Sequence, residues 1–104
     1  MRVIVHERVY EAVDAFYAAS IAKHPSLDLQ TVLDKEDRLY NALQTLGKSY
    51  YLYGEPRYIL DWKQKGYSDF IFEDFHFAFH VVVLPTGELV VSVEDARHSL
   101  LFHD

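Results

Sequence analysis

The side chains best suited to chemistry lie in residues 74–99, which read DFHFAFHVVVLPTGELVVSVEDARHS. Two runs of alternating residues flank a Pro-Thr-Gly turn at 85–87, a pattern that is typical of a β-hairpin. Successive side chains of a strand point to opposite faces, so the polar side chains of this hairpin gather on one face. That face is predicted to carry His76, His80, Ser92, Glu94 and His98.

These residue types suit general acid–base catalysis near neutral pH. Histidine and glutamate can take and return a proton, as RNA cleavage by attack of a 2′-hydroxyl requires. Glu94 is expected diagonal to His80, within reach of its side chain. The alternative is that a half-exposed sheet face carries ordinary polar residues, and the sequence leaves both interpretations open.

The pairing register of the hairpin decides which side chains share a face. A type I turn followed by a glycine bulge places Leu84 opposite Glu88. The pairs that follow are His80 with Ser92, Phe79 with Val93, Ala78 with Glu94 and His76 with Ala96. The apolar face is then expected beneath helices, and it consists of Phe75, Phe77, Phe79, Val81, Val83, Leu89, Val91 and Val93. The polar face is expected on the far side of the sheet, too polar to form a second core.

The sequence predicts neither a metal site nor a cofactor. His76 and His80 are four residues apart on a strand, so their Cβ atoms are about 13 Å apart, too far to share one ion. His6 lacks the second histidine of a zinc-protease helix. The chain has no cysteine, which excludes thiolate ligands. It also has no glycine-rich phosphate loop and no nucleophile-elbow serine.

Length and composition indicate one globular domain spanning residues 1–104. Half of the residues are hydrophobic and 15% are aromatic, enough for a real core. No apolar run is long enough to span a bilayer, and the charged start is unlike a secretory signal. We therefore expect a cytoplasmic protein without a membrane partner. The net charge of −6 argues against a surface that grips nucleic acid everywhere, although it allows a local basic patch.

Hydrophobic periodicity predicts a strand and two helices in the first half of the chain. Residues 1–5 are β-prone, and amphipathic helices follow near residues 8–23 and 28–46. Pro25 stops the first helix. Ser26 or Asp28 can cap the second helix, and Gly47 is expected to end it.

The second half of the chain is predicted to be mainly β-structure. The expected segments are β-like stretches at 49–54 and 56–62, a turn at 64–68, and a strand from 69 to 84 that enters the hairpin. The resulting fold class is α+β, in β-α-α-β-β-β order. A two-helix hairpin would pack on one face of an antiparallel sheet.

The first strand followed by ERVYEAVDAFYAASIA resembles the opening of the RelE/ParE superfamily, the small toxins of bacterial type II toxin–antitoxin systems. The segment FHFAFHVVVLPTGELVVSVEDARHS is similar to the closing hairpin of that family. There, an aromatic-rich strand, a tight turn and a hydrophobic strand lead to an Arg or His pair. The β-α-α-β-β-β order matches over nearly the whole chain.

The resemblance implies a toxin with a cognate antitoxin as its partner. Its RNA-cleaving members cut mRNA on the ribosome with residues on the sheet face away from the helices, whereas ParE-like members inhibit DNA gyrase. For a nuclease, the expected proton carriers are His80 and His98, with Glu94 orienting them or sharing that role. The expected phosphate-binding residues are Arg57, Lys63, Lys65 and Arg97. The chain departs from the family's nucleases in being acidic.

A non-enzymatic protein-binding module is the competing class of function. Such a module would use the open sheet face or a sheet edge. A cluster of aromatic residues supports this interpretation, because tyrosines are common at interfaces. The cluster comprises Tyr50, Tyr51, Tyr53, Tyr58 and Trp62, and these side chains can equally stack bases or fill a core.

Overall fold

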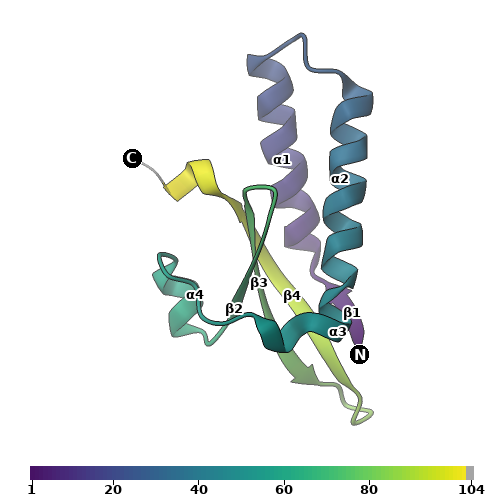
Figure 1. The fold of residues 1–104 in the computed structure, drawn as a ribbon, viewed down its shortest axis with the longest axis vertical. Coiled ribbons are helices and arrows are strands. Elements are labelled where there is room, and N and C mark those ends of the chain that lie inside the picture. Colours follow the sequence, from purple (N-terminus) through teal and green to yellow (C-terminus); the bar gives the residue numbers. More distant parts are fainter. Residues whose placement is uncertain (103–104) are drawn as a thin grey trace.

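A computed structural model describes residues 1–102 as an α+β domain (Figure 1). The elements in chain order are β1 (Arg2–Val5), α1 (Glu7–Lys23), α2 (Leu29–Gln44), α3 (Leu46–Ser49), the 3₁₀ turn η1 (Tyr50–Leu52), α4 (Leu60–Gln64), β2 (Ser68–Phe72), β3 (Phe75–Val83), β4 (Leu89–His98) and the 3₁₀ turn η2 (Ser99–Phe102). The order of the longer elements is β-α-α-β-β-β, as the sequence predicts.

The strands form one four-stranded sheet in the order β1-β4-β3-β2. Strands β2, β3 and β4 are antiparallel neighbours, whereas β1 runs parallel to β4. The sheet is therefore mixed, and the prediction of a purely antiparallel sheet is wrong. The N–H of His6 donates to the carbonyl of Val93 (2.8 Å), which extends the β1–β4 ladder to the start of α1.

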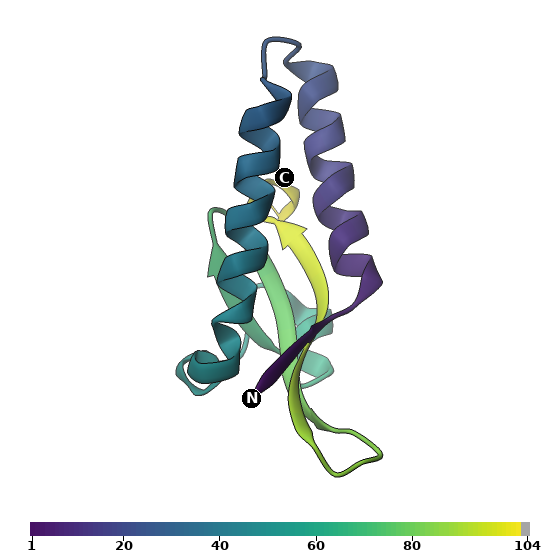
Figure 2. The same cartoon turned by 90° about the vertical axis from the view of Figure 1, so that its right-hand side faces the viewer.

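The main core lies between the sheet and the hairpin of α1 and α2. Figure 2 shows the two helices on one side of the strands, with the β3–β4 turn extending beyond them. Phe77 and Phe79 are buried on the helix side, whereas His76 and His80 belong to the other face, as expected. Val9 and Val13 of α1 meet Leu39 and Leu43 of α2 in the same core. The predicted helix pair and its position are confirmed.

Side chains cap both long helices. His6 precedes α1, and its Nδ1 accepts the N–H of Arg8 (3.1 Å). Asp28, one of the two caps predicted for α2, accepts the N–H of Gln30 (3.0 Å). Each cap satisfies a backbone donor that has no partner within its own helix.

The predicted β-structure between residues 49 and 62 is wrong. Tyr50–Leu52 forms a 3₁₀ turn, and Leu60–Gln64 forms helix α4. The apolar and aromatic residues of this stretch suit a half-buried strand locally. Of their side chains, Ile59 and Trp62 are buried, and both pack on Ala78 of β3, with Trp62 carried by helix α4. Tertiary packing has overridden local propensity here.

The predicted strand from 69 to 84 is divided by a tight turn. Glu73 and Asp74 have positive φ angles of 47° and 70°, and they join β2 to β3. A two-residue turn of this kind usually contains Asn or Gly, so the Glu-Asp pair gave no turn signal. Contacts from outside the hairpin hold it in place. Ser99 bonds the carbonyl of Asp74 through its N–H and hydroxyl, and Arg38 pairs with Glu73 (3.3 Å).

Gly47 lies inside α3 and does not end α2, so the predicted glycine cap is wrong. The residue is buried against the start of β1. A Cβ atom at this position would collide with the carbonyl oxygen of Met1. Glycine is therefore required by the close approach of two backbones.

Replacing Gly47 with alanine is expected to destabilise the fold by about 1–3 kcal/mol, the usual range for overpacking. Urea denaturation would measure the change. Gly54→Ala is the matched control, because a Cβ there meets nothing within 4 Å. Equal stability of Gly47→Ala and wild type would contradict the packing explanation.

An acidic contact joins the two long helices. Partial burial of Glu36, together with its hydrogen bond to Asp14, raises the pKa of Glu36 to about 7. Tyr40 shares this environment, and burial also raises its pKa. Glu36 is therefore a protonated carboxyl below neutral pH, and its ionisation places two negative charges between α1 and α2.

The α1–α2 hairpin is expected to weaken as pH rises. The folded pKa of Glu36 lies above its unfolded value, so its favourable contribution is full below about pH 4.5 and is lost as pH rises through about 7. Because Glu36 is partly exposed, we expect an effect of about 1 kcal/mol. Unfolding curves at pH 5 and 8 should show this loss for wild type and a smaller loss for Glu36→Gln. An identical pH dependence for the two proteins would contradict it.

Candidate acid–base site and an adjacent cavity

An extra residue in β4 changes the hairpin register halfway along. From the turn to the Phe79–Val93 pair the register is as predicted, and His80 lies opposite Ser92. Beyond this point Ala78 faces Asp95 and His76 faces Arg97, so the predicted pairs of Ala78 with Glu94 and of His76 with Ala96 are wrong. Glu94 is the unpaired residue of a β-bulge. A bulge turns every later side chain of its strand to the opposite face.

The bulge places His98 on the helix side of the sheet. Its ring stacks on Phe16 of α1 (centroids 3.9 Å apart) and meets the edge of Phe75 (4.9 Å). The predicted position of His98 on the face away from the helices is therefore wrong. Burial lowers the pKa of His98, assisted by nearby His76, although the charge of Asp74 acts in the opposite direction. His98 packs against the core, apart from the group formed by His80 and Glu94.

His80 and Glu94 do meet, as expected, on the face away from α1 and α2. Nε2 of His80 lies 3.1 Å from Oε1 of Glu94. The hydroxyl of Ser92 donates to the same oxygen at 2.5 Å. The ring of Tyr67 meets the imidazole of His80 edge-on, with centroids 5.0 Å apart. We call Tyr67, His80, Ser92 and Glu94 the acid–base group.

Glu94 is ionised at neutral pH. Burial alone raises the pKa of Glu94, but hydrogen bonds from Ser92 and His80, together with the charge of His80, outweigh it, and the net shift is downward. In the neutral form of His80, a carboxylate in this position favours the imidazole tautomer that carries its proton on Nε2, which leaves Nδ1 as the proton acceptor. Burial, followed by the charge of Glu94, raises the pKa of Tyr67, so its hydroxyl stays protonated at neutral pH.

The junction of β1 and α1 adds residues that sequence reasoning missed. The charge of His6 contributes to the lowered pKa of Glu94, and the charge of Arg8 acts on Tyr67. Both residues reach this region because β1 pairs with β4 next to the bulge. No local pattern shows that residues 6 and 94 are neighbours, since they meet only through strand pairing.

Arg97 is held by carboxylates. Its guanidinium forms two hydrogen bonds to Asp61 of α4 (3.0 and 2.5 Å) and lies 3.8 Å from Asp95. It also lies over the ring of Trp62 (5.1 Å). The indole N–H of Trp62 donates to Asp95 (3.2 Å). This cluster fixes α4 to the sheet, and the bidentate contact with Asp61 occupies the groups that would bind phosphate.

The sheet face away from the long helices is partly covered, contrary to prediction. Ile59 and Trp62 pack on Ala78, with Tyr67 beside them, and form a small second core. Ala78 is small enough for the indole to approach the sheet closely. The acid–base group lies on one side of this contact along β3, and His76 lies on the other.

The other basic residues predicted to bind phosphate are dispersed. Nζ of Lys63 lies 3.9 Å from Glu55, and both side chains are exposed. Nζ of Lys65 lies 6.0 Å from the ring centre of Tyr67, so it flanks the acid–base group. Arg57 lines a separate cavity. Arg57, Lys63, Lys65 and Arg97 therefore do not form one phosphate site.

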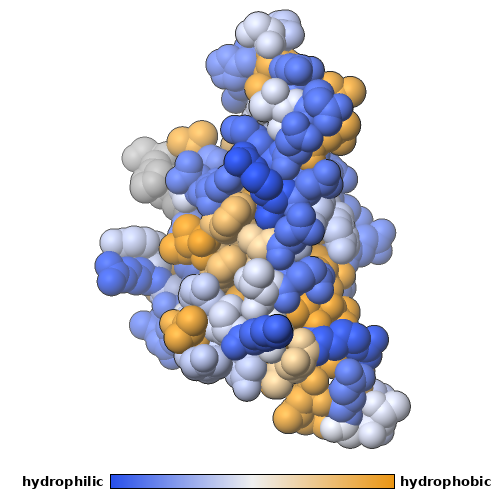
Figure 3. All heavy atoms as spheres, turned by 45° about the vertical axis from the view of Figure 1, so that its right-hand side comes forward, coloured by the Kyte–Doolittle hydropathy of each residue, from blue (hydrophilic) through white to orange (hydrophobic). Residues whose placement is uncertain are grey.

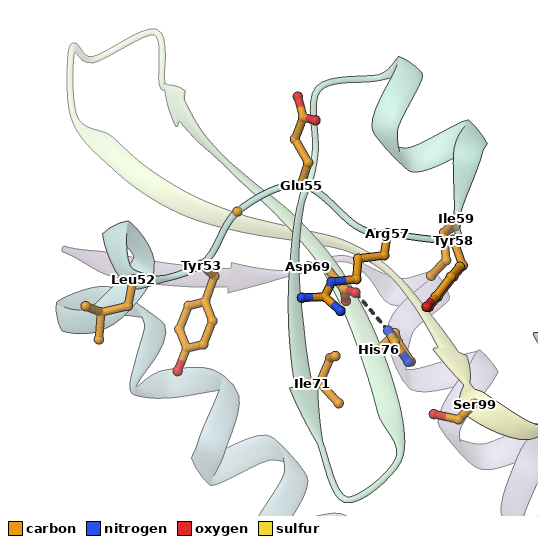
Figure 4. A pocket seen from close by; sticks show the side chains of 11 residues that line it. Leu52, Tyr53, Glu55, Arg57, Tyr58, Ile59, Asp69, Ile71, His76 and Ser99 are labelled. Atoms are coloured by element: carbon orange, nitrogen blue, oxygen red, sulfur yellow. Dashed lines mark hydrogen bonds and ion pairs between the residues drawn. The ribbon is translucent and has the colours of Figure 1, made fainter.

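The separate cavity has a volume of about 520 Å³ and lies between residues 52–59 and the strands β2 and β3 (Figure 4). Asp69 and His76 face it, with His76 Nδ1 2.8 Å from Asp69 Oδ2. Sequence reasoning assigned no role to Asp69, because its pairing with His76 depends on the β2–β3 register.

Within the part of the chain that the structure describes, no group of three His, Cys, Asp or Glu side chains lies close enough to hold a metal ion. No helix in the same part of the chain is long and apolar enough to cross a bilayer. Comparison with protein-family models and with curated proteins finds no match to this chain. Its function is therefore inferred from the geometry of the site.

His98 is expected to act as a pH-sensitive packing residue. Its folded pKa lies below its unfolded value, so its contribution to stability is full above about pH 6.5 and is lost as pH falls below it. Replacement by phenylalanine keeps a ring on Phe16 and removes the charge. Between pH 8 and 5 we expect wild type to lose more stability than His98→Phe, measured by thermal unfolding. A larger loss in the variant would contradict the prediction.

Proposed function

We propose that the protein is a toxin of the RelE/ParE type that cleaves RNA at the acid–base group and is neutralised by a cognate antitoxin. The observation that carries this proposal is the 3.1 Å contact between His80 and Glu94, on the sheet face away from the helical hairpin. The side chain of His80 is about one-third exposed, so it is open to a substrate. The β-α-α-β-β-β order of the longer elements is a further point in favour.

The group has the parts that 2′-hydroxyl attack needs. Glu94 accepts a hydrogen bond from the Nε2–H of His80, and Nδ1 takes the proton of the substrate's 2′-hydroxyl. The O2′–phosphorus bond forms as the bond from phosphorus to the 5′-oxygen breaks, and the 5′-oxygen takes a proton from the hydroxyl of Tyr67. Arg8 and Lys65 supply positive charge beside the group, where negative charge develops on the phosphate.

This assignment revises the roles that the sequence predicts. Glu94 orients and polarises His80, because its lowered pKa leaves it without a proton to give. Tyr67 takes the place of His98 as the second proton carrier, since His98 is stacked on Phe16. Arg8 and Lys65 are assigned the phosphate-binding role. The sequence predicts this role for Arg57, Lys63, Lys65 and Arg97.

A protein-binding module is the second candidate, and one surface favours it. Val81, Val83 and Leu89 lie on the helix face of the sheet, beyond the reach of α1 and α2, and remain exposed. Figure 3 shows apolar side chains at this lower end of the molecule, whereas the helical end is mostly hydrophilic. A partner that covers such a patch would gain from the burial of apolar area.

Expression without a partner is expected to arrest bacterial growth, with cleavage of translated mRNA. His80→Ala and Glu94→Ala should lower the cleavage rate roughly 100- to 10,000-fold, the usual range for loss of acid–base catalysis. His24→Ala is the matched control, because His24 is an exposed histidine at the end of α1. His98→Phe should retain activity. Primer extension on mRNA from induced cells measures the cleavage.

Other outcomes separate the alternatives. Cleavage by wild type that His80→Ala and Glu94→Ala leave unchanged would show that the assigned site is wrong. Growth arrest without cleavage would point to gyrase inhibition, which a supercoiling assay tests. Absence of arrest at high expression, together with a stable protein complex that is lost on Val83→Asp but kept in His80→Ala, would favour the binding module.

A further inference from the structure

The cavity beside β2 combines an apolar wall with a few polar groups, the usual character of a small-molecule site. Its volume of about 520 Å³ exceeds that of a nucleotide base with its sugar. Ile59 and Ile71 line it, together with Tyr58, whose side chain is largely exposed. Figure 4 shows Arg57, Asp69 and His76 gathered in its centre, from the 52–59 segment, β2 and β3 respectively.

The buried carboxylate of Asp69 requires a ligand that donates hydrogen bonds. Its side chain is only 9% exposed, and Oδ2 meets His76. The other oxygen, Oδ1, is buried and accepts no hydrogen bond from the described residues. A buried acceptor without a donor is costly, so a ligand that reaches this carboxylate and donates hydrogen bonds to it would be favoured.

Arg57 decides which kind of donor fits. A lysine or arginine side chain from a partner would satisfy Asp69, but it would bring a second positive charge beside Arg57. A neutral donor with an anionic tail meets both groups, because the tail can pair with the exposed guanidinium. Tyr58 offers an exposed ring on which a planar ligand can stack.

We propose that this cavity binds a guanine nucleotide. The guanine edge presents two adjacent donors, N1–H and the N2 amino group, which match a carboxylate, whose two oxygens only accept. Adenine, cytosine and uracil have no two adjacent donor groups on that edge, so each would turn an acceptor toward the carboxylate beside its single donor. The base stacks on Tyr58 and its phosphate meets Arg57. The site shares no residue with the acid–base group, so it does not rest on the proposed function.

Isothermal titration calorimetry on the intact chain tests the base and the phosphate separately. Wild type should bind GMP at least about 10-fold more tightly than AMP. Asp69→Asn should weaken GMP binding roughly 10- to 100-fold and abolish the preference for guanine, because the amide offers a donor where the base needs an acceptor. Arg57→Ala should weaken GMP binding while leaving guanosine binding unchanged, since guanosine has no phosphate.

Two controls keep these results interpretable. Arg2→Ala removes the same charge from an exposed arginine that pairs with Glu88, outside the cavity, and should bind GMP like wild type. Thermal unfolding shows whether Asp69→Asn is folded. Arg57→Ala provides an independent test, because its side chain is exposed and its loss should not unfold the protein.

A further titration shows whether the ligand is a guanosine within RNA or a free nucleotide. If the dinucleotide GpU, with its phosphate on the 3′ side of guanosine, binds more tightly than GMP, the cavity reads a guanosine within RNA. If GMP binds more tightly, the ligand is a free nucleotide. Absence of GMP binding to wild type at millimolar concentration would overturn the proposal. Equal binding of GMP and AMP, or wild-type affinity in folded Asp69→Asn, would overturn it as well.

Discussion

The bulge at Glu94 is the constraint on which both faces of the sheet depend. Before it, Val91 and Val93 face the helices; after it, Ala96 and His98 do. A regular strand would have turned Asp95 and Arg97 toward the apolar core, where the desolvation of two charges would strongly oppose folding. The single extra residue keeps these charges on the far face. It also frees Glu94 from cross-strand pairing, so its carboxylate can reach His80 and Ser92.

Because Asp95 and Arg97 stay on the far face, the short helix α4 can dock there. Trp62 bonds Asp95, Asp61 bonds Arg97, and the indole lies beneath the guanidinium. These contacts reinforce one another, since Asp95 and Arg97 are partly buried and each would be costly without a partner, while Asp61 is more exposed. The docked helix divides the far face into two regions along β3. The acid–base group with His80 lies on one side, and the cavity with His76 and Asp69 lies on the other.

The cations near the two regions of the far face differ in charge from the chain as a whole. The net charge of −6 disfavours long-range attraction of phosphate. Local cations act over shorter distances, within about one Debye length of 8–10 Å at moderate salt. Arg8 and Lys65 lie near the acid–base group, and Arg57 lines the cavity. Arg97 contributes little to such attraction, because Asp61 and Asp95 neutralise it.

Features that depend on near neighbours in the chain could be predicted from the amino-acid sequence. The apolar period of the two long helices, the cap at Asp28 and the turn at residues 85–87 follow from local sterics and hydrogen bonding, and all were predictable. The same local register brought His80 opposite Ser92, whereas Glu94 reaches His80 from the bulge. The tertiary structure decided what depends on distant segments. The parallel pairing of β1, the helical state of residues 60–64 and the close approach of Gly47 to Met1 arise from packing between segments far apart in sequence. The bulge at Glu94 also depends on distant segments. An alternating pattern of residues cannot show where a strand contains one extra residue. The position of the bulge is favoured because it buries Ala96 and His98 and keeps Arg97 beside Asp61.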